Sequence, residues 1–166
     1  MMIHCQTVRD DQLDRMAELK MVPSIFIAHT YYWGNVHLKN LGPVRGAHIS
    51  PVKAAMDRGL VYNFHQDPPV VKPDMMHTVW CAVNRLTRSG QPIGQDQCIG
   101  TYDALKGVTI NGAYAYHEEN VKGSLLAGKL ADMVILDQNP LKVEKMKLAN
   151  VKVLMTIKEG NVVYEA

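Results

Sequence analysis

The sequence has few cysteines and no long apolar run. Cys5, Cys81 and Cys98 form no Cys-x-x-Cys pair, which argues against a zinc knuckle or a disulfide scaffold. No apolar run approaches the ~20 residues of a membrane helix, so a membrane partner is not expected. The first residues also lack a basic segment followed by an apolar run, and we expect no signal peptide. A reducing, cytoplasmic location is the expected one.

Several functional motifs are absent as well. The chain contains no GxGxxG or GxxxxGKS/T phosphate-binding loop and no GxSxG nucleophile turn. Its 18 Lys and Arg are spread along the sequence, and the net charge is only +2. Nucleic-acid binding is therefore not expected from charge. Only residues 30–39, TYYWGNVHLK, offer aromatic and basic side chains that could stack on bases.

What the sequence does contain fits one globular domain with a real core. It has 166 residues, of which 47% are hydrophobic and 20% charged. Strand-like and helix-like patterns alternate along its first three quarters, which predicts an α/β fold with a parallel sheet. We expect strands over 1–4, 22–29 and 60–65, helices over 9–20, 51–59, 74–90, 102–106 and 110–116, and a long loop over 30–49. The expected helix N-caps are Asp10 or Asp11, Ser50 and Asp74.

Strand and turn patterns replace the helical ones from Gly123 onward. The apolar run from Met133 to Leu136 predicts one strand, and residues 151–165 predict a hairpin with its turn at 159–161. The chain is thus expected to hold a βα part followed by a small β part, and the two meet around residues 116–122.

A histidine or an aspartate closes each of the three predicted parallel strands. His4 and His29 end the first two, and the third ends in His65-x-Asp67 before two prolines. The carboxyl ends of parallel strands meet at one edge of a sheet or barrel, where active sites lie. Histidine and carboxylate side chains suit zinc or another divalent ion, and a carboxylate can also accept a proton. The pattern therefore favours a metal or acid/base site.

Each of these residues also has an ordinary structural interpretation. An aspartate before proline is common in turns, and for Asp67 the two interpretations balance. His4 is equally compatible with a polar residue at a strand end, which the local sequence slightly favours. Tyr32 and Trp33 could line a substrate pocket or simply cover the core. Two further histidines lie in the same predicted loop, and loops of this length are often functional.

Several segments resemble a known family. GSLLAGKLADMVILDQNPL is similar to the C-terminal signature of the metal-dependent amidohydrolase superfamily. SIFIAHTYYWG and ISPVKAAMDRGLVYNFHQDPPV resemble its branch that includes the N-substituted formamide deformylases. The resemblance extends over nearly all of the chain. It implies the C-terminal part of a (β/α)8 TIM-type barrel over residues 1–118, followed by strands of a small β-sandwich over residues 119–166.

The resemblance also implies roles for individual residues. His4 matches a metal-binding histidine on the sixth barrel strand, and Asp67 matches the catalytic aspartate on the eighth. His29 matches a seventh-strand position that faces the same mouth of the barrel. The implied cofactor is a divalent metal, expected to be zinc, with His4 and Asp67 as ligands and Asp67 as the catalytic base. The substrate pocket, or the positioning of the ligands, is assigned to His29, Tyr32, Trp33 and His65.

Other parts of the family's site have no counterpart in this sequence. No His-x-His pair occurs among the seven histidines, and neither the mid-barrel acidic bridge nor the fifth-strand histidine has a match. We therefore expect the C-terminal portion of an amidohydrolase, which hydrolyses an amide-type C–N bond of a small molecule with water activated by a metal. The alternative is a non-catalytic half-barrel that assembles or binds a partner. Because two ligands hold an ion poorly and a cut barrel exposes an edge strand, we expect a homo-oligomer or a partner that supplies the N-terminal half.

Overall fold

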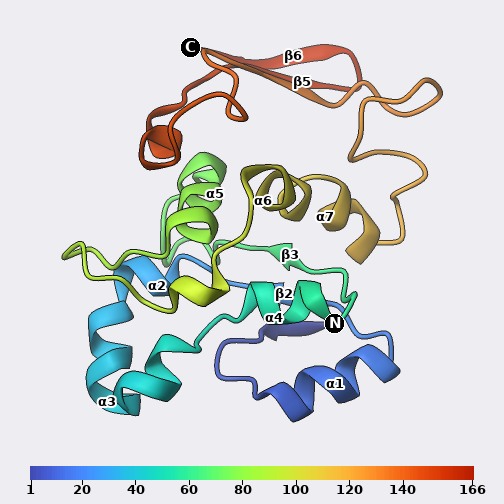
Figure 1. The fold of residues 1–166 in the computed structure, drawn as a ribbon. Helices are drawn as coiled ribbons and strands as arrows, with labels where there is room; N and C mark the ends of the chain where they lie inside the picture. Colours follow the sequence, from blue (N-terminus) through green and yellow to red (C-terminus); the bar gives the residue numbers. More distant parts are fainter.

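The computed structural model describes residues 1–166 and has a mixed α/β fold, as the sequence predicts. Three short parallel strands form a sheet in the order β1-β2-β3: β1 is Met2–His4, β2 is Pro23–Ile25 and β3 is Asn63–Phe64. The helices are α1 (Asp10–Glu18), α2 (His29–Tyr32), α3 (Gly34–Ala47), α4 (Val52–Asp57), α5 (Met75–Asn84), α6 (Thr101–Gly107) and α7 (Ile110–Ala115). In Figure 1, α1 lies beside β1, whereas α6 and α7 lie against β3.

Helix α1 forms where its apolar stripe was predicted. Leu13 and Met16 are one turn apart and almost fully buried, while the other face is exposed and charged. The expected N-cap is wrong by one residue. Arg9 occupies the cap position, where its backbone N–H donates to the Gln12 side chain at 3.0 Å, and Asp10 is the first helical residue. Its carboxylate still lies in the first turn, where it complements the helix dipole.

The predicted long loop over 30–49 is wrong, because α2 and α3 occupy most of it. The glycines and the proline of this stretch serve packing and a kink within the helix. A Cβ at Gly46 would lie 2.8 Å from the His37 carbonyl oxygen, so only glycine lets the two turns of α3 approach so closely. The kink in α3 is at Gly42, with φ 77°, followed by Pro43, which lacks the N–H of a continuous helix.

Two other helix boundaries also differ from the prediction. Helix α5 does begin at Asp74, whose Oδ1 accepts the His77 backbone N–H at 2.9 Å. However, it ends at Asn84 and not at Gly90, because Arg85 adopts the left-handed conformation with φ 45°. Ser50 is not an N-cap: Pro51 holds that position before α4, and Ser50 donates its backbone N–H to Gln6.

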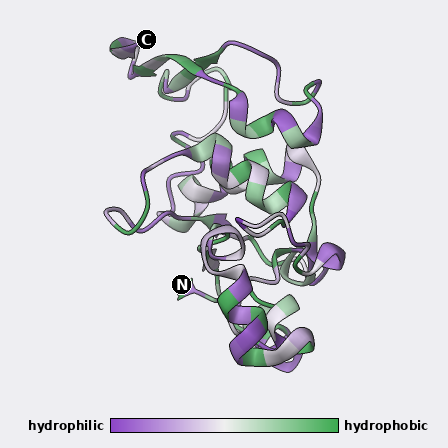
Figure 2. Cartoon of the chain, turned by 90° about the vertical axis from the view of Figure 1, so that its left-hand side faces the viewer, coloured by the Kyte–Doolittle hydropathy of each residue, from purple (hydrophilic) through white to green (hydrophobic).

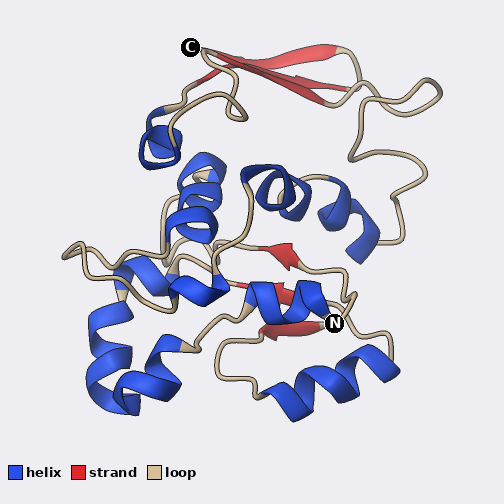
Figure 3. Cartoon of the chain, viewed as in Figure 1, coloured by secondary structure: helices blue, strands red, loops and turns tan.

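The C-terminal part forms the predicted strands. Its antiparallel sheet has the order β4-β5-β6, with β4 Met133–Leu136, β5 Val153–Lys158 and β6 Asn161–Glu165. Glu159 and Gly160, both with positive φ, form the two-residue turn of the hairpin. This sheet lies beyond α5, α6 and α7, at the far end of the molecule from α1 (Figure 1 and Figure 3). Its strands carry hydrophobic residues, which are green in Figure 2. Val162 and Val163 on β6 are more than half exposed.

One hydrophobic core joins the parallel strands to the later part of the chain. Phe26 and Ile27, which follow β2, are almost fully buried, and Leu148 near the C-terminus belongs to the same cluster. Trp80 on α5 donates its indole N–H to the Met146 carbonyl at 3.0 Å. The 3-10 helix η2 (Lys145–Asn150) thereby packs on α5. None of the helices combines the length and apolar character needed to cross a membrane.

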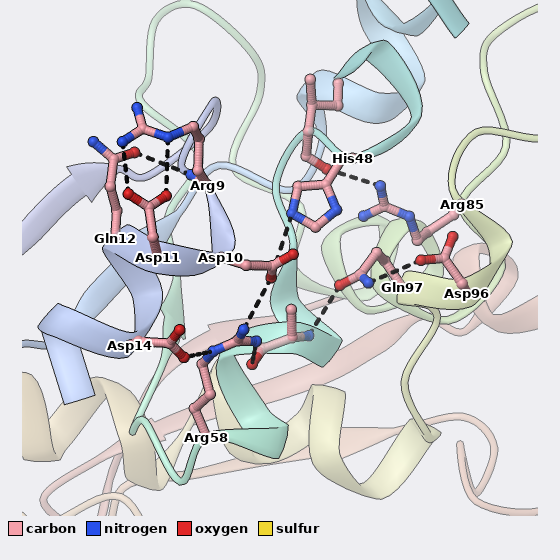
Figure 4. Close-up of polar contacts among 12 residues, drawn as sticks. Arg9, Asp10, Asp11, Gln12, Asp14, His48, Arg58, Arg85, Asp96 and Gln97 are labelled. Atoms are coloured by element: carbon pink, nitrogen blue, oxygen red, sulfur yellow. Dashed lines mark hydrogen bonds and ion pairs between the residues drawn. The ribbon is translucent and has the colours of Figure 1, made fainter. Parts of the chain in front are cut away.

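Arg85 is a fully buried cation that holds several loops together. Its guanidinium donates hydrogen bonds of 2.8–3.2 Å to the backbone carbonyls of Ala47, Ile49, Ser50 and Ile93. Burial lowers its pKa to about 10. Figure 4 shows this side chain beside a second network, in which Arg58, the residue that follows α4, pairs with Asp10 at 3.1 Å and with Asp14 at 2.6 Å. Arg85 thus fixes the segment between α3 and α4 against the end of α5, and Arg58 fixes the end of α4 against α1.

We expect Arg85→Ala to lower the free energy of unfolding by roughly 3 kcal/mol. Removing the guanidinium leaves buried carbonyls without donors, each of which costs about 1–3 kcal/mol. Urea titration followed by tryptophan fluorescence measures the change. The matched control is Arg88→Ala, whose side chain is exposed, and it should alter stability by less than about 0.5 kcal/mol. Equal stability of the two variants would contradict a structural role for Arg85.

Candidate functional site

The carboxyl ends of the three parallel strands bring four predicted site residues together. The ring centroid of His4 lies 4.8 Å from that of His65 and 5.8 Å from that of His29. Nε2 of His4 lies 3.6 Å from Oδ2 of Asp67. Since β1 and β3 are the outer strands of the sheet, His4 and Asp67 meet across the end of β2.

The backbone is strained on both sides of this pair. His4 and Asp67 have φ of 63° and 51°, a conformation that few non-glycine residues adopt. Cys5 shares it with φ 45°. The backbone thus turns sharply at His4 after β1 and at Asp67 after β3, and the two side chains approach each other there. Strain of this kind persists where the surrounding structure imposes it, and it clusters at functional sites.

His29 lies at the start of α2 and packs between aromatic rings. Its centroid is 4.6 Å from Phe26 and 4.7 Å from Trp33. Burial, followed by the proximity of His37, lowers the His29 pKa to about 4, so the ring is neutral at pH 7. Trp33 therefore contacts the histidine cluster, whereas the ring neighbours of Tyr32 are Tyr31, His77 and Trp33 itself.

His37 is a member of the cluster that the sequence did not single out. It comes from α3, and its Nε2 lies 2.8 Å from Gln6 Nε2 and 3.4 Å from His29 Nδ1. Burial lowers its pKa. Because His29 and His37 lie on two different helices, α2 and α3, no spacing along a single helix in the sequence pointed to their contact. The other histidine of that segment, His48, lies 3.9 Å from Asp10 and outside the cluster.

His65 packs against His4 and Phe26 in the cluster. Its Nδ1 lies 3.0 Å from the hydroxyl oxygen of Ser24 on β2, and its Nε2 is buried without a hydrogen-bond partner. Burial and the neighbouring His4 lower its pKa. The site therefore places three imidazoles with lowered pKa values, those of His29, His37 and His65, near one carboxylate.

The residues fit a divalent ion only in part. Two donor atoms on one zinc ion stand about 3.4 Å apart, which is close to the 3.6 Å between His4 Nε2 and Asp67 Oδ2. No group of three or more His, Cys, Asp and Glu side chains is arranged to hold a metal. The chain thus presents two adjoining side chains of types that bind metals, whereas catalytic zinc sites have three protein ligands.

Two cavities of the molecule lie away from this cluster. One of about 670 Å³ lies between Thr7–Asp10 and the end of α3, and one of about 870 Å³ lies between α6, α7 and the C-terminal sheet. Neither is lined by the histidine cluster. The His4–Asp67 pair is open to solvent instead, with side chains 38% and 48% exposed.

Comparison with known proteins places the chain in a family. Residues 1–164 match the model of the Amidohydrolase family, and the chain belongs to it. An N-substituted formamide deformylase of Arthrobacter pascens is 29% identical over 172 residues, which cover 98% of this chain and 30% of that protein. The chain thus spans about a third of that relative's length. The family was predicted from the sequence, and this prediction is confirmed.

Solved structures share the fold. An uncharacterized metal-dependent hydrolase from Pyrococcus horikoshii OT3 superimposes with a TM-score of 0.75 at 29% identity, over 86% of this chain and 29% of that one. An amidohydrolase from Thermotoga maritima MSB8 superimposes with a TM-score of 0.69 at 17% identity, over 99% of this chain and 36% of that one. The second similarity shows the fold alone.

We expect stability to fall as the pH drops from about 6.5 to about 4. The pKa of His29 is about 4 in the folded chain and about 6.5 in the unfolded chain, so the unfolded chain binds more protons between these values. The stabilisation from the neutral ring is complete above pH 6.5 and is lost on acidification. His37, His65 and His77 also have lowered pKa values and act in the same direction.

Urea midpoints measured from pH 8 to pH 4 test this expectation. His29→Gln should give a shallower decline than the wild-type chain. His117→Asn serves as the control, because His117 is exposed and asparagine tolerates its φ of 59°. If His29→Gln and wild type declined in parallel, the neutral state of His29 would contribute nothing to the pH dependence.

Proposed function

We propose that this chain forms the C-terminal part of a metal-dependent amidohydrolase that hydrolyses an amide-type C–N bond. The observation that carries the proposal is the 3.6 Å approach of His4 Nε2 and Asp67 Oδ2 at the carboxyl ends of the parallel strands. Membership of the Amidohydrolase family and the likeness to metal-dependent hydrolases support it. The substrate class follows the relative named N-substituted formamide deformylase.

His4 and Asp67 would hold the ion, which we propose to be zinc. A divalent ion bound there supplies a Lewis acid that lowers the pKa of water and polarises a carbonyl. Asp67 would accept a proton from the attacking water and deliver it to the leaving nitrogen. Neutral His29 and His65 would surround the substrate with hydrogen-bonding groups that add no positive charge. Trp33, in contact with His29, would form an apolar wall beside them, and Tyr32 would lie further out.

The same proposal assigns the architecture. We propose that residues 1–118 are barrel strands six to eight of a (β/α)8 barrel with their helices, and that residues 119–166 are β-sandwich strands. The parallel order β1-β2-β3 with helical crossovers is the pattern of such a barrel. Residues Leu148 and Val151 nevertheless share the core of the first part, so the two parts are packed together.

A partner would complete the barrel. Strand β1 lies at the edge of its sheet, and Met2 and Ile3 on it are 44% and 55% exposed. An exposed apolar edge strand favours pairing with another strand. We propose that the occupant is either the N-terminal part of an amidohydrolase or a second copy of this chain, and that it contributes the missing ligands.

A non-catalytic assembly module is the second candidate function. The absence of any three-ligand metal group in this chain favours it, because the chain then offers its exposed edge but no complete site. In this case the edge of β1 would still bind its partner, whereas divalent ions would have no effect on the chain or on the complex.

We expect zinc to raise the unfolding temperature of the wild-type chain and to leave that of Asp67→Asn unchanged. An ion that binds only the folded state at a hundred times its Kd adds about 2.7 kcal/mol of stability. Differential scanning calorimetry with zinc and then with excess chelator measures the shift. Asp57→Asn is the matched control, since Asp57 is an exposed carboxylate paired with Lys53. No shift in the wild-type chain, alone or with an N-terminal amidohydrolase segment, would favour the assembly module.

We also expect the purified chain to self-associate through β1. Sedimentation velocity should show species heavier than the 18.6 kDa chain, and Ile3→Lys should return them to the monomer. Val44→Lys changes an apolar residue that is 82% exposed on α3 and should not. A monomer at all concentrations would argue that the edge is left for a different chain.

A further inference from the structure

Gln66 is a buried amide that comes directly before Asp67 in the sequence. It is only 5% exposed, and its side chain reaches the beginning of α5. Its Nε2 donates one hydrogen bond to the Asp74 carbonyl and a second, of 2.6 Å, to the Thr78 hydroxyl oxygen. The side chain thus joins the two ends of the loop over residues 66–74, which carries Asp67.

The orientation of the Gln66 amide follows from the Asp74 carbonyl. A carbonyl oxygen only accepts hydrogen bonds, so the amide has to present its nitrogen there. The reversed amide would bring two acceptor oxygens into contact. In the observed orientation the nitrogen has two acceptors, and the Thr78 hydroxyl itself donates to the Asp74 carbonyl at 3.0 Å. Only the Gln66 Oε1, an acceptor, is buried without a partner.

Helix α5 is a firmly packed support for this loop. Residues 78–84 of the helix are all buried, and Trp80 donates its indole N–H to the Met146 carbonyl. Asp67, by contrast, has a left-handed backbone with φ 51°. Strain of this kind persists only where the surrounding contacts impose it, and the hydrogen bonds of Gln66 are such contacts on the residue next to Asp67.

We propose that Gln66 is a positioning residue, which holds the loop so that the Asp67 carboxylate stays within 3.6 Å of His4 Nε2. The effect passes through a covalent bond, since Gln66 and Asp67 share a peptide group. On the other side of Asp67, its carbonyl accepts the Val70 N–H at 2.8 Å, so the backbone is restrained in both directions. The consequence for zinc rests on the ligand role proposed for Asp67.

Backbone ¹⁵N relaxation of the 166-residue chain measures the effect at Asp67 itself. The order parameter of the Asp67 N–H should be about 0.85 in the wild-type chain and below about 0.6 in Gln66→Met, which keeps the side-chain length but removes the donor. Gln66→Asn, whose amide is one methylene too short, should behave alike. Gln97→Met is the matched control, because Gln97 is 7% exposed and its amide oxygen accepts the Ala54 N–H at 2.9 Å. It should also lower the urea midpoint, yet leave the Asp67 order parameter at the wild-type value.

Two results would overturn the proposal: a wild-type order parameter at Asp67 in a folded Gln66→Met or Gln66→Asn variant, or an equal loss of order in Gln97→Met. Zinc affinity by calorimetry then tests the consequence for the metal. Gln66→Met should weaken zinc binding by roughly tenfold or more, and Gln97→Met should stay near the wild-type value. If the wild-type chain binds no zinc, the proposed metal chemistry fails, whereas the relaxation data still decide whether Gln66 holds the loop.

Discussion

Parallel pairing of β1 and β3 with the central strand β2 is the constraint on which the rest of the structure depends. Residues 4, 25 and 64 stand in register across the sheet, so the segments after them leave from one edge. His4 is more than 60 residues away from His65 and Asp67 in the sequence, and only this pairing brings it within contact distance of them. A slip of one residue in either pairing would turn these side chains to the opposite face.

The sequence predicted the parallel sheet and the C-terminal hairpin, because one simple rule decides each of them. Strand–helix alternation predicted a parallel sheet, which is confirmed. His4 ends its strand as predicted, whereas β2 ends at Ile25 and His29 lies at the start of α2. The hairpin turn at Glu159 and Gly160 followed from local turn chemistry. The family could be recognised because its motifs lie at these same positions. Each of these features depends on residues that are close in sequence or on one global pattern.

What could not be predicted depends on contacts between distant segments. The segment of α3 was predicted as a loop, since the close approach of Gly46 to His37 is visible only once the helix is folded. His37 was not named as a site residue, because its contact with His29 joins two separate helices. The end of α5 is decided by Arg85, whose left-handed backbone is compensated by hydrogen bonds to carbonyls from two other segments, residues 47–50 and Ile93. Ser24 gave no signal at all, because its partner is 41 residues away.

The charge of the site favours the binding of a cation. Burial lowers the pKa values of His29, His37 and His65, so around pH 7 these rings add no positive charge next to the Asp67 carboxylate. A cluster of protonated imidazoles would instead repel a divalent ion and neutralise the carboxylate. Burial of these rings makes the stability fall on acidification. It also keeps their ring nitrogens unprotonated around pH 7, so that lone pairs are available. The His4–Asp67 pair remains open to solvent, so an ion could reach it, and what the chain lacks is a third ligand.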